Sequence, residues 1–274
     1  MNRHRYIEFK DIKICHHGPY VLTGISNLET GSATSRKINY IDTDGSERRD
    51  IFYSERVFEI SGIIHAENAD EMVKLKRRLI SRCCLKEKFM IEYFNRCEKY
   101  VAQCFFDKLP TFGSRQGWIL PFKLYAVIPG FFWQSALLHK IDIFGYEDEV
   151  TESFTLPCVF TSRFHKKAVS NLGDGAVYPV FVVKCNASSQ GSTILLKNNT
   201  TGKQVLINYQ TSDGEVVTVD MANQYVSSSI NGNITNRVTL DSEFFSLEQG
   251  VNEIESVSAG NVVVTQFREQ FLGV

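Results

Sequence analysis

Hydrophobic and polar residues alternate along much of the first half of the chain, and a period of two predicts β-strands. In "FEISGII", Phe58, Ile60, Gly62 and Ile64 fall on one face of a predicted strand. A second strand is predicted in "GWILPFKLYAVIPGFFW", where alternate positions on both faces are substantially apolar. We expect this strand to be covered on both sides or to lie against a neighbouring subunit. Pro121, within it, favours the edge of a sheet over its centre.

A tight turn is predicted at Asp44-Gly45, between two strand-like segments of "YIDTDGSERRDIFYSERVFEISGIIHA". Asp-Gly pairs accept the positive φ angles of a two-residue hairpin turn. The sequence therefore predicts a β-hairpin centred on these two residues.

One segment changes period. In "NADEMVKLKRRLISRCC", apolar residues recur every three or four positions, which predicts an amphipathic helix near residues 69–84. Its predicted buried stripe is Met72, Leu75, Leu79 and Cys83. Asn68 can cap the first turn, with Glu71 placed to reach back as in a capping box. We interpret the basic run 74–78 as a solvated helix face rather than as a phosphate site.

Beyond about residue 150 we find no helical period. Short predicted strands recur instead, separated by turn pairs such as Asp174-Gly175, Thr201-Gly202 and Asp213-Gly214. This spacing predicts an antiparallel β-sandwich or jelly roll. The fold class is thus mainly β with one helix: an N-terminal barrel-like domain over 1–150 and a sandwich over 151–274. No Gly/Ser-rich or Pro-rich linker separates the two, so we expect packed domains.

Composition narrows the function classes. The chain has 274 residues, 43% of them hydrophobic, which supports a folded core rather than disorder. Its 30 basic and 31 acidic residues give a net charge of −1, which disfavours nucleic-acid binding as the main task. We see no secretory signal and no apolar run long enough for a membrane helix. The 7 cysteines lack a disulfide-type spacing, so we expect reduced thiols and no disulfides.

Candidate chemistry is sparse. Cys15-His16-His17 lacks the ligand spacing of a structural zinc site, so we expect no metal. The acidic set Glu215, Asp220, Asp241 and Glu243 could hold the carboxylate pair of a glycosidase, but we interpret these residues as solubilising acids beside turns and strands. No nucleophile motif occurs either. We therefore predict no catalysis and no cofactor.

Glycan binding is a separate hypothesis, because sandwiches can present aromatic platforms to sugars. The predicted sandwich has Tyr178, Tyr209 and Tyr225, whereas both tryptophans, Trp118 and Trp133, lie in the first domain. We favour the interpretation that these tyrosines span the sandwich core and its rim.

Three blocks in this order resemble the distal tail proteins of long-tailed bacteriophages, the siphovirus tail component family. They are "FEISGIIHAENADEMVKLKRRL", then "GWILPFKLYAVIPGFFW", then "NLGDGAVYPVFVVKCNASSQGSTILLKNNTTGKQVLINYQTSDGEVVTVD". The last contains an Asn-x-Gly-Asp opening, a Tyr-Pro strand start and an Asn-x-Thr-Gly turn. Together the blocks span nearly the whole chain.

The resemblance implies a baseplate hub in the virion tail tip. Six copies of the first domain would form a ring, singly or as two stacked rings, around a channel through which DNA passes. The second domain would be galectin-like and face outward. The implied partners are the tail tube protein, the tail-associated lysin or tip protein, and receptor-binding or other baseplate proteins, with no membrane.

A ring requires one surface patch to meet a different one on the next copy. Our candidate subunit interface combines the predicted hairpin with the apolar strand: Asp44, Gly45, Trp118, Leu120, Phe122 and Leu124. The alternatives are a glycan-binding adhesion module, a wall-degrading enzyme, and a tail-tube or other baseplate subunit with a related barrel.

Overall fold

A computed structural model describes residues 5–28, 33–39, 46–83, 85–143, 165–185, 193–257 and 262–274. The chain divides into two compact units. Unit 1 comprises Met1–Ala136 and Gln270–Val274, and unit 2 comprises Leu137–Glu269. The domain boundary expected from the sequence, at residue 150, lies later in the chain than the start of unit 2 at Leu137. Nothing in the composition of residues 270–274 indicates that they return to unit 1.

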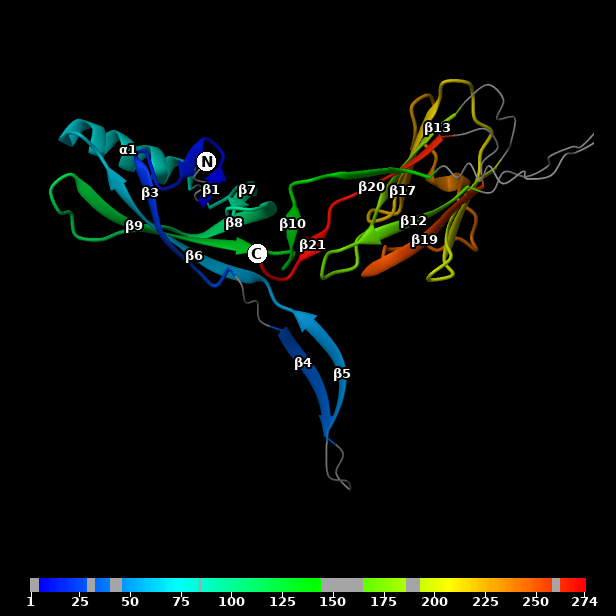
Figure 1. Cartoon of the computed structure of the whole chain (residues 1–274), viewed down its shortest axis with the longest axis horizontal. Helices are drawn as coiled ribbons and strands as arrows, with labels where there is room; N and C mark the ends of the chain where they lie inside the picture. Colours follow the sequence, from blue (N-terminus) through cyan, green and yellow to red (C-terminus); the bar gives the residue numbers. More distant parts are fainter. Residues whose placement is uncertain are drawn as a thin grey trace, which may run out of the picture. The chain divides into compact units, whose positions relative to one another are not determined.

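Unit 1 is built on a nine-stranded antiparallel sheet (Figure 1). Its main path runs β2-β1-β7-β8-β9-β6-β3, and β10 pairs with both β8 and β21. The strands are β1 (Tyr6–Phe9), β2 (Ile12–Ile14), β3 (Tyr20–Ser26), β6 (Arg56–His65), β7 (Phe89–Phe94), β8 (Lys99–Phe112), β9 (Ile119–Ile128), β10 (Trp133–Ser135) and β21 (Gln270–Phe271).

Backbone hydrogen bonds at Cys15 bring the two ends of this path together. The Cys15 N–H donates to the Tyr20 carbonyl at 3.2 Å, and the Leu22 N–H donates to the Cys15 carbonyl at 2.9 Å. The residue after β2 is thereby joined to β3, so the sheet curls toward closure, as the predicted barrel-like domain requires.

The alternating pattern decides which side chains fill the inside of the curled sheet. Phe58, Ile60 and Ile64 of β6 are fully buried. Across the β6–β9 ladder, Gly62 lies opposite Phe122, whose ring occupies the space that a side chain at residue 62 would need. The single face predicted for this strand is therefore confirmed as the core face.

Strand β9 lies between β6 and β8, not at an edge. Pro121 is tolerated there because β8 ends at Phe112, beside it. The Pro121 carbonyl accepts a hydrogen bond from the Gly113 N–H, the first residue after that end. The donor that proline lacks is thus missing just where the ladder with β8 stops, which corrects the prediction of an edge position.

The predicted helix is α1 (Ala69–Arg82). Met72, Leu79 and Cys83 are buried and Leu75 packs against the core, so the predicted stripe is confirmed. The Asn68 side chain accepts a hydrogen bond from the Glu71 N–H at 2.9 Å. The Glu71 carboxylate accepts one from the N–H of Glu67, the residue before the cap, at 2.7 Å.

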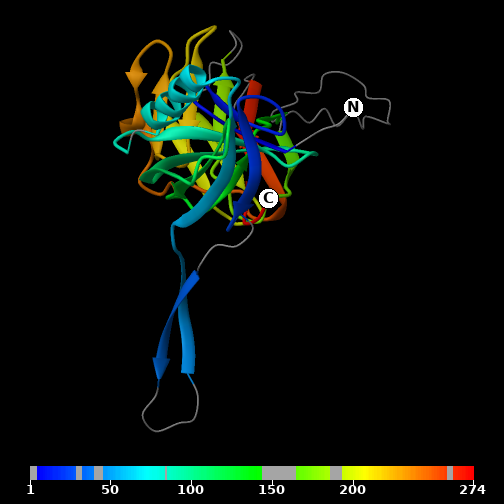
Figure 2. The same ribbon diagram turned by 90° about the vertical axis from the view of Figure 1, so that its left-hand side faces the viewer.

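Strands β4 (Ala33–Asn39) and β5 (Ser46–Tyr53) follow β3 and precede β6 in the chain, and they form a two-stranded sheet of their own (Figures 1 and 2). They pair antiparallel from Ala33 opposite Tyr53 to Asn39 opposite Ser46. The predicted hairpin therefore exists, while its predicted turn residues, Asp44 and Gly45, lie outside the described residues.

Unit 2 consists of two antiparallel sheets with a core between them, so the prediction of a mainly β chain with one helix and a C-terminal sandwich is confirmed. Both inner faces supply buried residues, such as Phe181 and Val219 from one sheet and Leu196 and Ile254 from the other. One sheet, in order, is β11 (His139–Asp142), β20 (Val262–Phe267), β13 (Val180–Lys184), β16 (Val216–Asp220), β17 (Tyr225–Ser228) and β18 (Gly232–Asn233); the other is β12 (His165–Asn171), β19 (Gly250–Val257), β14 (Thr193–Asn198) and β15 (Gln204–Asn208).

Strand β11 explains why unit 2 begins before residue 150. It pairs with β20 from His139 opposite Phe267 to Asp142 opposite Val264. The next residue, Ile143, belongs to the core of unit 2. Among the residues described here, no helix is long and apolar enough to cross a membrane.

Candidate subunit-contact surface

The outer face of unit 1 carries an apolar patch where β3, β6 and β9 lie side by side. Val21 pairs with Ile63, and Ile63 pairs with Pro121. Ile119, two residues along β9 from Pro121, is 38% exposed. We call Val21, Ile63, Ile119 and Pro121 the outer apolar patch. These residues alternate with the core residues of the same strands, so they point away from the core.

Trp118 precedes β9 and is 47% exposed. The Arg115 guanidinium lies over its indole, 5.2 Å from the ring centroid. Arg115 also donates from Nε to the Gly117 carbonyl at 2.8 Å, which holds the guanidinium in place. A stacked arginine and tryptophan at a strand turn match the residue types that dominate protein interfaces.

The same outer face is polar farther along β6 and β9. Lys123 forms an ion pair with Glu59 at 2.7 Å, and the Ser61 hydroxyl donates to Glu59 at 3.0 Å. The hydrogen bond from Lys123 holds the pKa of the Glu59 carboxyl below its usual range. Such exposed pairs add little stability, so we assign them to the rim of the patch.

The sequence-based interface residues separate into three groups. Leu120, Phe122 and Leu124 are 7%, 1% and 0% exposed, so their side chains fill the core of unit 1 and leave no surface for another copy. Trp118 is exposed, and Asp44 and Gly45 are not described. Both faces of this strand are apolar, and the alternation alone does not reveal which one points inward.

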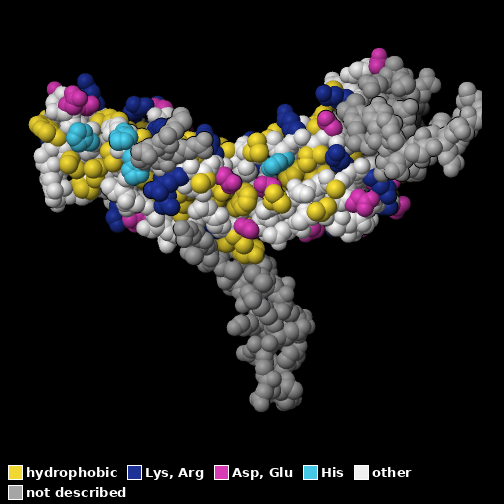
Figure 3. Space-filling model, viewed as in Figure 1, with side chains coloured by type: hydrophobic (Ala, Val, Ile, Leu, Met, Phe, Trp, Pro, Cys, Tyr) yellow, Lys and Arg dark blue, Asp and Glu magenta, His cyan; other side chains and the backbone are white. Residues whose placement is uncertain are grey.

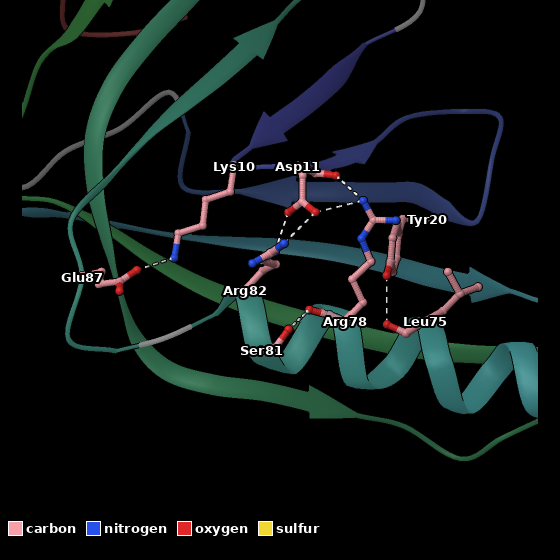
Figure 4. A network of polar contacts seen from close by, with 8 residues as sticks. All are labelled: Lys10, Asp11, Tyr20, Leu75, Arg78, Ser81, Arg82 and Glu87. Carbon is pink, nitrogen blue, oxygen red and sulfur yellow. Dashed lines mark hydrogen bonds and ion pairs between the residues drawn. The ribbon is translucent and has the colours of Figure 1, made fainter.

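Polar contacts fix the β1–β2 turn to helix α1 (Figure 4). The Asp11 carboxylate forms ion pairs with Arg82 Nε at 2.6 Å and Arg78 Nη2 at 3.0 Å. The hydrogen bond from Arg82, supported by that from Arg78, lowers the pKa of Asp11. The Tyr20 hydroxyl donates to the Leu75 carbonyl at 2.9 Å. Arg78, the last residue of the basic run, is thereby paired with Asp11 while its side chain stays 49% exposed, which agrees with the interpretation of a solvated helix face.

Arg56 anchors the base of the β4–β5 hairpin. Its side chain is buried, with Nη1 donating to the Leu28 carbonyl at 2.7 Å and Nη2 donating to the Leu272 carbonyl. The guanidinium carbon lies 4.9 Å from the Phe131 ring centroid, and Phe131 stacks on Tyr53 with 4.5 Å between centroids. Burial lowers the pKa of Arg56. The Arg56 side chain thus links the residues that flank the hairpin to the C-terminal segment of unit 1.

The acidic residues of unit 2 hold local structure. Glu215 is buried and accepts hydrogen bonds from the Tyr209 hydroxyl at 2.6 Å, from the Ser212 N–H at 2.8 Å and from Ser228 Oγ. Burial by itself raises the pKa of Glu215. The three hydrogen bonds together outweigh this effect, so the pKa lies below its usual value. An acid with a lowered pKa is a poor proton donor near neutral pH.

Asp220 is likewise used in a turn. It accepts hydrogen bonds from the backbone N–H groups of Ala222 and Asn223 at 2.9 and 3.0 Å. Glu243 lies on the surface, 4.0 Å from the Lys203 ammonium. Glu215 and Asp220 are therefore held by local hydrogen bonds, whereas Asp241 and Glu243 are exposed surface residues.

The three tyrosines considered for glycan binding differ in exposure. Tyr178 and Tyr225 are 52% and 42% exposed. Tyr209 is half-buried, with its hydroxyl bound to Glu215 inside the sandwich. Tyr178 and Tyr225 therefore present more surface to a ligand than Tyr209 does.

No group of three or more His, Cys, Asp or Glu residues in the described part of the chain is arranged to hold a metal ion. Cys15, Cys83, Cys97, Cys104 and Cys185 are free thiols, whereas Cys84 and Cys158 are not described. Burial raises the pKa of the Cys83 thiol to about 12, so this cysteine is a core residue rather than a nucleophile.

In a comparison with protein families, residues 173–271 match the model of the siphovirus-type tail component, C-terminal domain. No curated protein matches the sequence significantly.

Solved structures show the same fold over the whole chain. The crystal structure of the SPP1 Dit (gp 19.1) protein, described as a paradigm of the hub adsorption apparatus in phages infecting Gram-positive bacteria, is 12% identical. It superposes with a TM-score of 0.76, covering 98% of this chain and 99% of that one. A chain of the phage P2 baseplate, in its activated conformation with Ca, is 10% identical, with a TM-score of 0.55 and full coverage of both chains.

Proposed function

We propose that this chain, whose residues 173–271 match the model of the siphovirus-type tail component, C-terminal domain, is a structural component of a phage tail and the subunit of a ring-shaped hub at the tail tip. In this proposal six copies of unit 1 surround a channel for the DNA. Unit 2 carries the attachment sites for receptor-binding and other baseplate proteins. The tail tube protein and the tail-associated lysin or tip protein contact the two sides of the ring.

The outer apolar patch is the observation that carries this proposal. Val21, Ile63, Ile119 and Pro121 occupy one face of three paired strands, with the stacked Trp118 and Arg115 just before the start of β9. Figure 3 shows hydrophobic side chains, with histidines beside them, on the surface of unit 1 at the end where α1 lies. Stable interfaces bury on the order of 1,600 Å² in total, with apolar centres and polar rims. The patch and the Glu59–Lys123 pair supply both parts.

The hairpin supplies a second contact in the proposed ring. Strands β4 and β5 pair only with each other among the described strands, so an isolated chain gives this ribbon little support. Docking against the next copy would provide that support. Because the hairpin and the patch are different surfaces, their contact is heterologous, which is the type that closes into a ring.

The nearly neutral charge of the chain is compatible with a channel through which DNA passes without being bound. The chain has a net charge of −1, and Asp11 offsets part of the basic charge of α1. A strongly basic channel would hold DNA through many phosphate contacts.

The mass of the purified chain tests the ring. We expect native mass spectrometry to show a hexamer, or two hexamers together. The double substitution Ile63→Glu with Ile119→Glu should convert it to monomers, because it places charges in a desolvated contact. Leu240→Glu, at a fully exposed position of unit 2, is the matched control and should leave the ring intact. A wild-type chain that stays monomeric at high concentration would contradict the proposal.

A glycan-binding role is the second candidate, favoured by the exposed rings of Tyr178 and Tyr225. Glycan-array binding by the full chain that is lost in both Tyr178→Ala and Tyr225→Ala would support it. Binding that survives these substitutions, or its absence, would leave the structural role alone.

A further inference from the structure

The central strands of the six-stranded sheet of unit 2 are apolar on both faces, although the sandwich core covers only one of them. The inner face supplies fully buried residues such as Phe181 and Val217. The alternate positions of the same strands point away from that core. These outward residues are small and β-branched: Val264 of β20, Val180 and Val182 of β13, and Val216 and Thr218 of β16. We call these five residues the outer valine face.

The strand register makes this face continuous. Val182 lies directly opposite Val264 on one side and Thr218 on the other, and Val180 is the next outward residue along β13. All five residues are partly exposed, and the four valines pack against neither of the two hydrophobic cores that the described residues form. A sheet face in water normally carries polar residues, whereas strands covered on both sides are apolar throughout. The outer valine face therefore has the composition of a covered surface.

The four-stranded sheet of the same sandwich shows the usual solvated pattern on its outer face. Lys166 of β12 lies opposite Glu255 of β19, which in turn lies opposite Lys197 of β14. The Lys166 ammonium is 3.4 Å from the Glu253 carboxylate and 3.7 Å from that of Glu255. Both sheets give one face to the same core, so the core does not explain why the outward residues are charged on one sheet and apolar on the other.

Charged residues of both signs border the outer valine face. Lys140 and Asp142 lie on the edge strand β11, and Lys184 and Asp220 lie at opposite ends of the sheet on the neighbouring strands β13 and β16. A partner with charges of one sign would meet repulsion as well as attraction at this border. A second copy turned end over end, by contrast, brings its Lys184 toward the Asp220 of the first. The border is thus complementary to itself, as a two-fold contact requires.

The shape of the face favours the same occupant. Its centre consists of valine and threonine side chains, so no large side chain needs a pocket on the partner. Two sheets of this kind pack face to face about 10 Å apart, with their side chains interdigitating. Removing the valine methyl groups from water supplies the driving force.

We propose that the outer valine face binds the same face of a second copy of this chain, with Lys184 of each copy near Asp220 of the other. With strands about 4.8 Å apart and outward residues about 6.8 Å apart along a strand, the face covers only about 300–400 Å². Stable interfaces bury about 800 Å² per partner, so we expect a dissociation constant of about 0.1–1 mM for two free chains. In an assembly that holds many copies in place, several such weak contacts act together. The contact belongs to unit 2 and does not depend on the proposed ring contact of unit 1.

The test uses the full chain carrying Ile63→Glu and Ile119→Glu, or the wild type if that is monomeric, so that the ring contact does not interfere. At micromolar concentration the weak contact leaves this chain monomeric, as the mass spectrometry test above requires. In sedimentation equilibrium up to millimolar concentration, we expect the average mass to rise toward that of two chains. In NMR of the isotope-labelled chain, the methyl signals of Val180, Val182 and Val264 should shift over the same concentration range.

Protein variants locate the contact. Val182→Lys places two like charges against each other at the centre of the face and should weaken association by about tenfold or more. Lys184→Glu, at the border, should weaken it by about threefold or more, because the new carboxylate meets Asp220 of the other copy. Both side chains point outward, so we expect unchanged thermal midpoints. Ala168→Lys, at an exposed outward position of the four-stranded sheet, is the matched control and should leave association unchanged.

Four results would overturn the inference: the mass of a single chain at every concentration, equal association of Val182→Lys and Ala168→Lys, unchanged association of Lys184→Glu, or concentration-dependent shifts confined to residues outside the six-stranded sheet. Contacts of the valine methyl groups with residues 144–164 of the same chain, seen in the monomer, would also overturn it. In that case the chain itself would cover the face.

Discussion

Single residues in this chain are specified by close packing and by complete hydrogen bonding. At Gly62, a Cβ atom would lie 2.5 Å from Phe122 Cζ and 2.8 Å from the Val21 carbonyl oxygen. In unit 2, the buried Asn171 side chain donates to the carbonyls of Gly175 and Leu247, and its oxygen accepts from the Gly173 N–H. Such residues build turns and layers, which explains why strongly specified segments can lack catalytic groups.

Gly62→Ala tests the packing of unit 1. The new methyl group would collide with Phe122 and the β3 backbone, and overpacking of this kind costs about 1–3 kcal/mol. We expect a lower urea midpoint in denaturation followed by tryptophan fluorescence. Gly24→Ala in β3, where a Cβ meets nothing within 4 Å, is the control and should be at least as stable as wild type. Equal stability of the two variants would refute the close approach.

Glu215→Gln tests the buried carboxylate of unit 2. Because the folded-state pKa of Glu215 lies below the ordinary value of 4.5, its stabilisation is present above pH 4.5 and is lost as the pH falls through the folded-state pKa. We expect the variant to be less stable at pH 7 by about 1.5–3 kcal/mol, the range for hydrogen bonds to a charged group. Thermal unfolding should show this gap narrowing as the pH falls below 4.5, whereas exposed Glu243→Gln should show no gap. A gap constant with pH would contradict the assignment.

At the scale of elements, local pattern and packing agree for most of the strands and for helix α1. The helix has its cap at Asn68 and its apolar stripe on the core. The β4–β5 hairpin is different, because it pairs with no other described strand and is tied to unit 1 at its base through Arg56 and Tyr53. An element with so little support in one copy is explained best by a role in assembly.

Replacing residues 29–52 by a short Gly/Ser linker tests that role. The replacement keeps Leu28, Tyr53 and Arg56, so the anchor at the base remains, and we expect the thermal midpoint of unfolding to change little. The hexamer expected in native mass spectrometry should be lost. A shortened chain that still assembles would exclude the hairpin from the subunit contact.

At the scale of the whole molecule, each unit has its own hydrophobic core, and the chain passes between the units twice, after Ala136 and after Glu269. The C-terminal segment closes unit 1, with β21 paired to β10 and Phe271 packed edge-on against Tyr100 at 5.5 Å. A cut at residue 150 would therefore remove β11 from the sandwich and the last strand from unit 1.

Two fragments test this division. Residues 137–269 should fold with a single cooperative transition in calorimetry, because they contain β11 and Ile143. Residues 151–274 should be less stable, since they expose the edge of β20 and leave a cavity where Ile143 packs. Equal stability of the two fragments would place the boundary at the later position.

The sequence by itself determined the elements of this protein: the strands, the capped helix, the hairpin and the all-β second half. Each is encoded locally, by alternation, by a period near 3.6 or by turn residues, and this is why most of these predictions are confirmed. The resemblance to siphovirus tail components likewise rests on the order of such local blocks, and the match of residues 173–271 bears it out.

Only the tertiary structure decided which face of each strand is the surface. Strand β9 is apolar on both sides, so alternation separated Leu120 and Phe122 from Ile119 and Pro121 without saying which pair meets solvent. Their burial depends on β6 and the curl of the sheet, which are contacts distant in sequence. For the same reason the return of β21 to unit 1 has no local signal. It arises from pairing between segments that only the fold brings together.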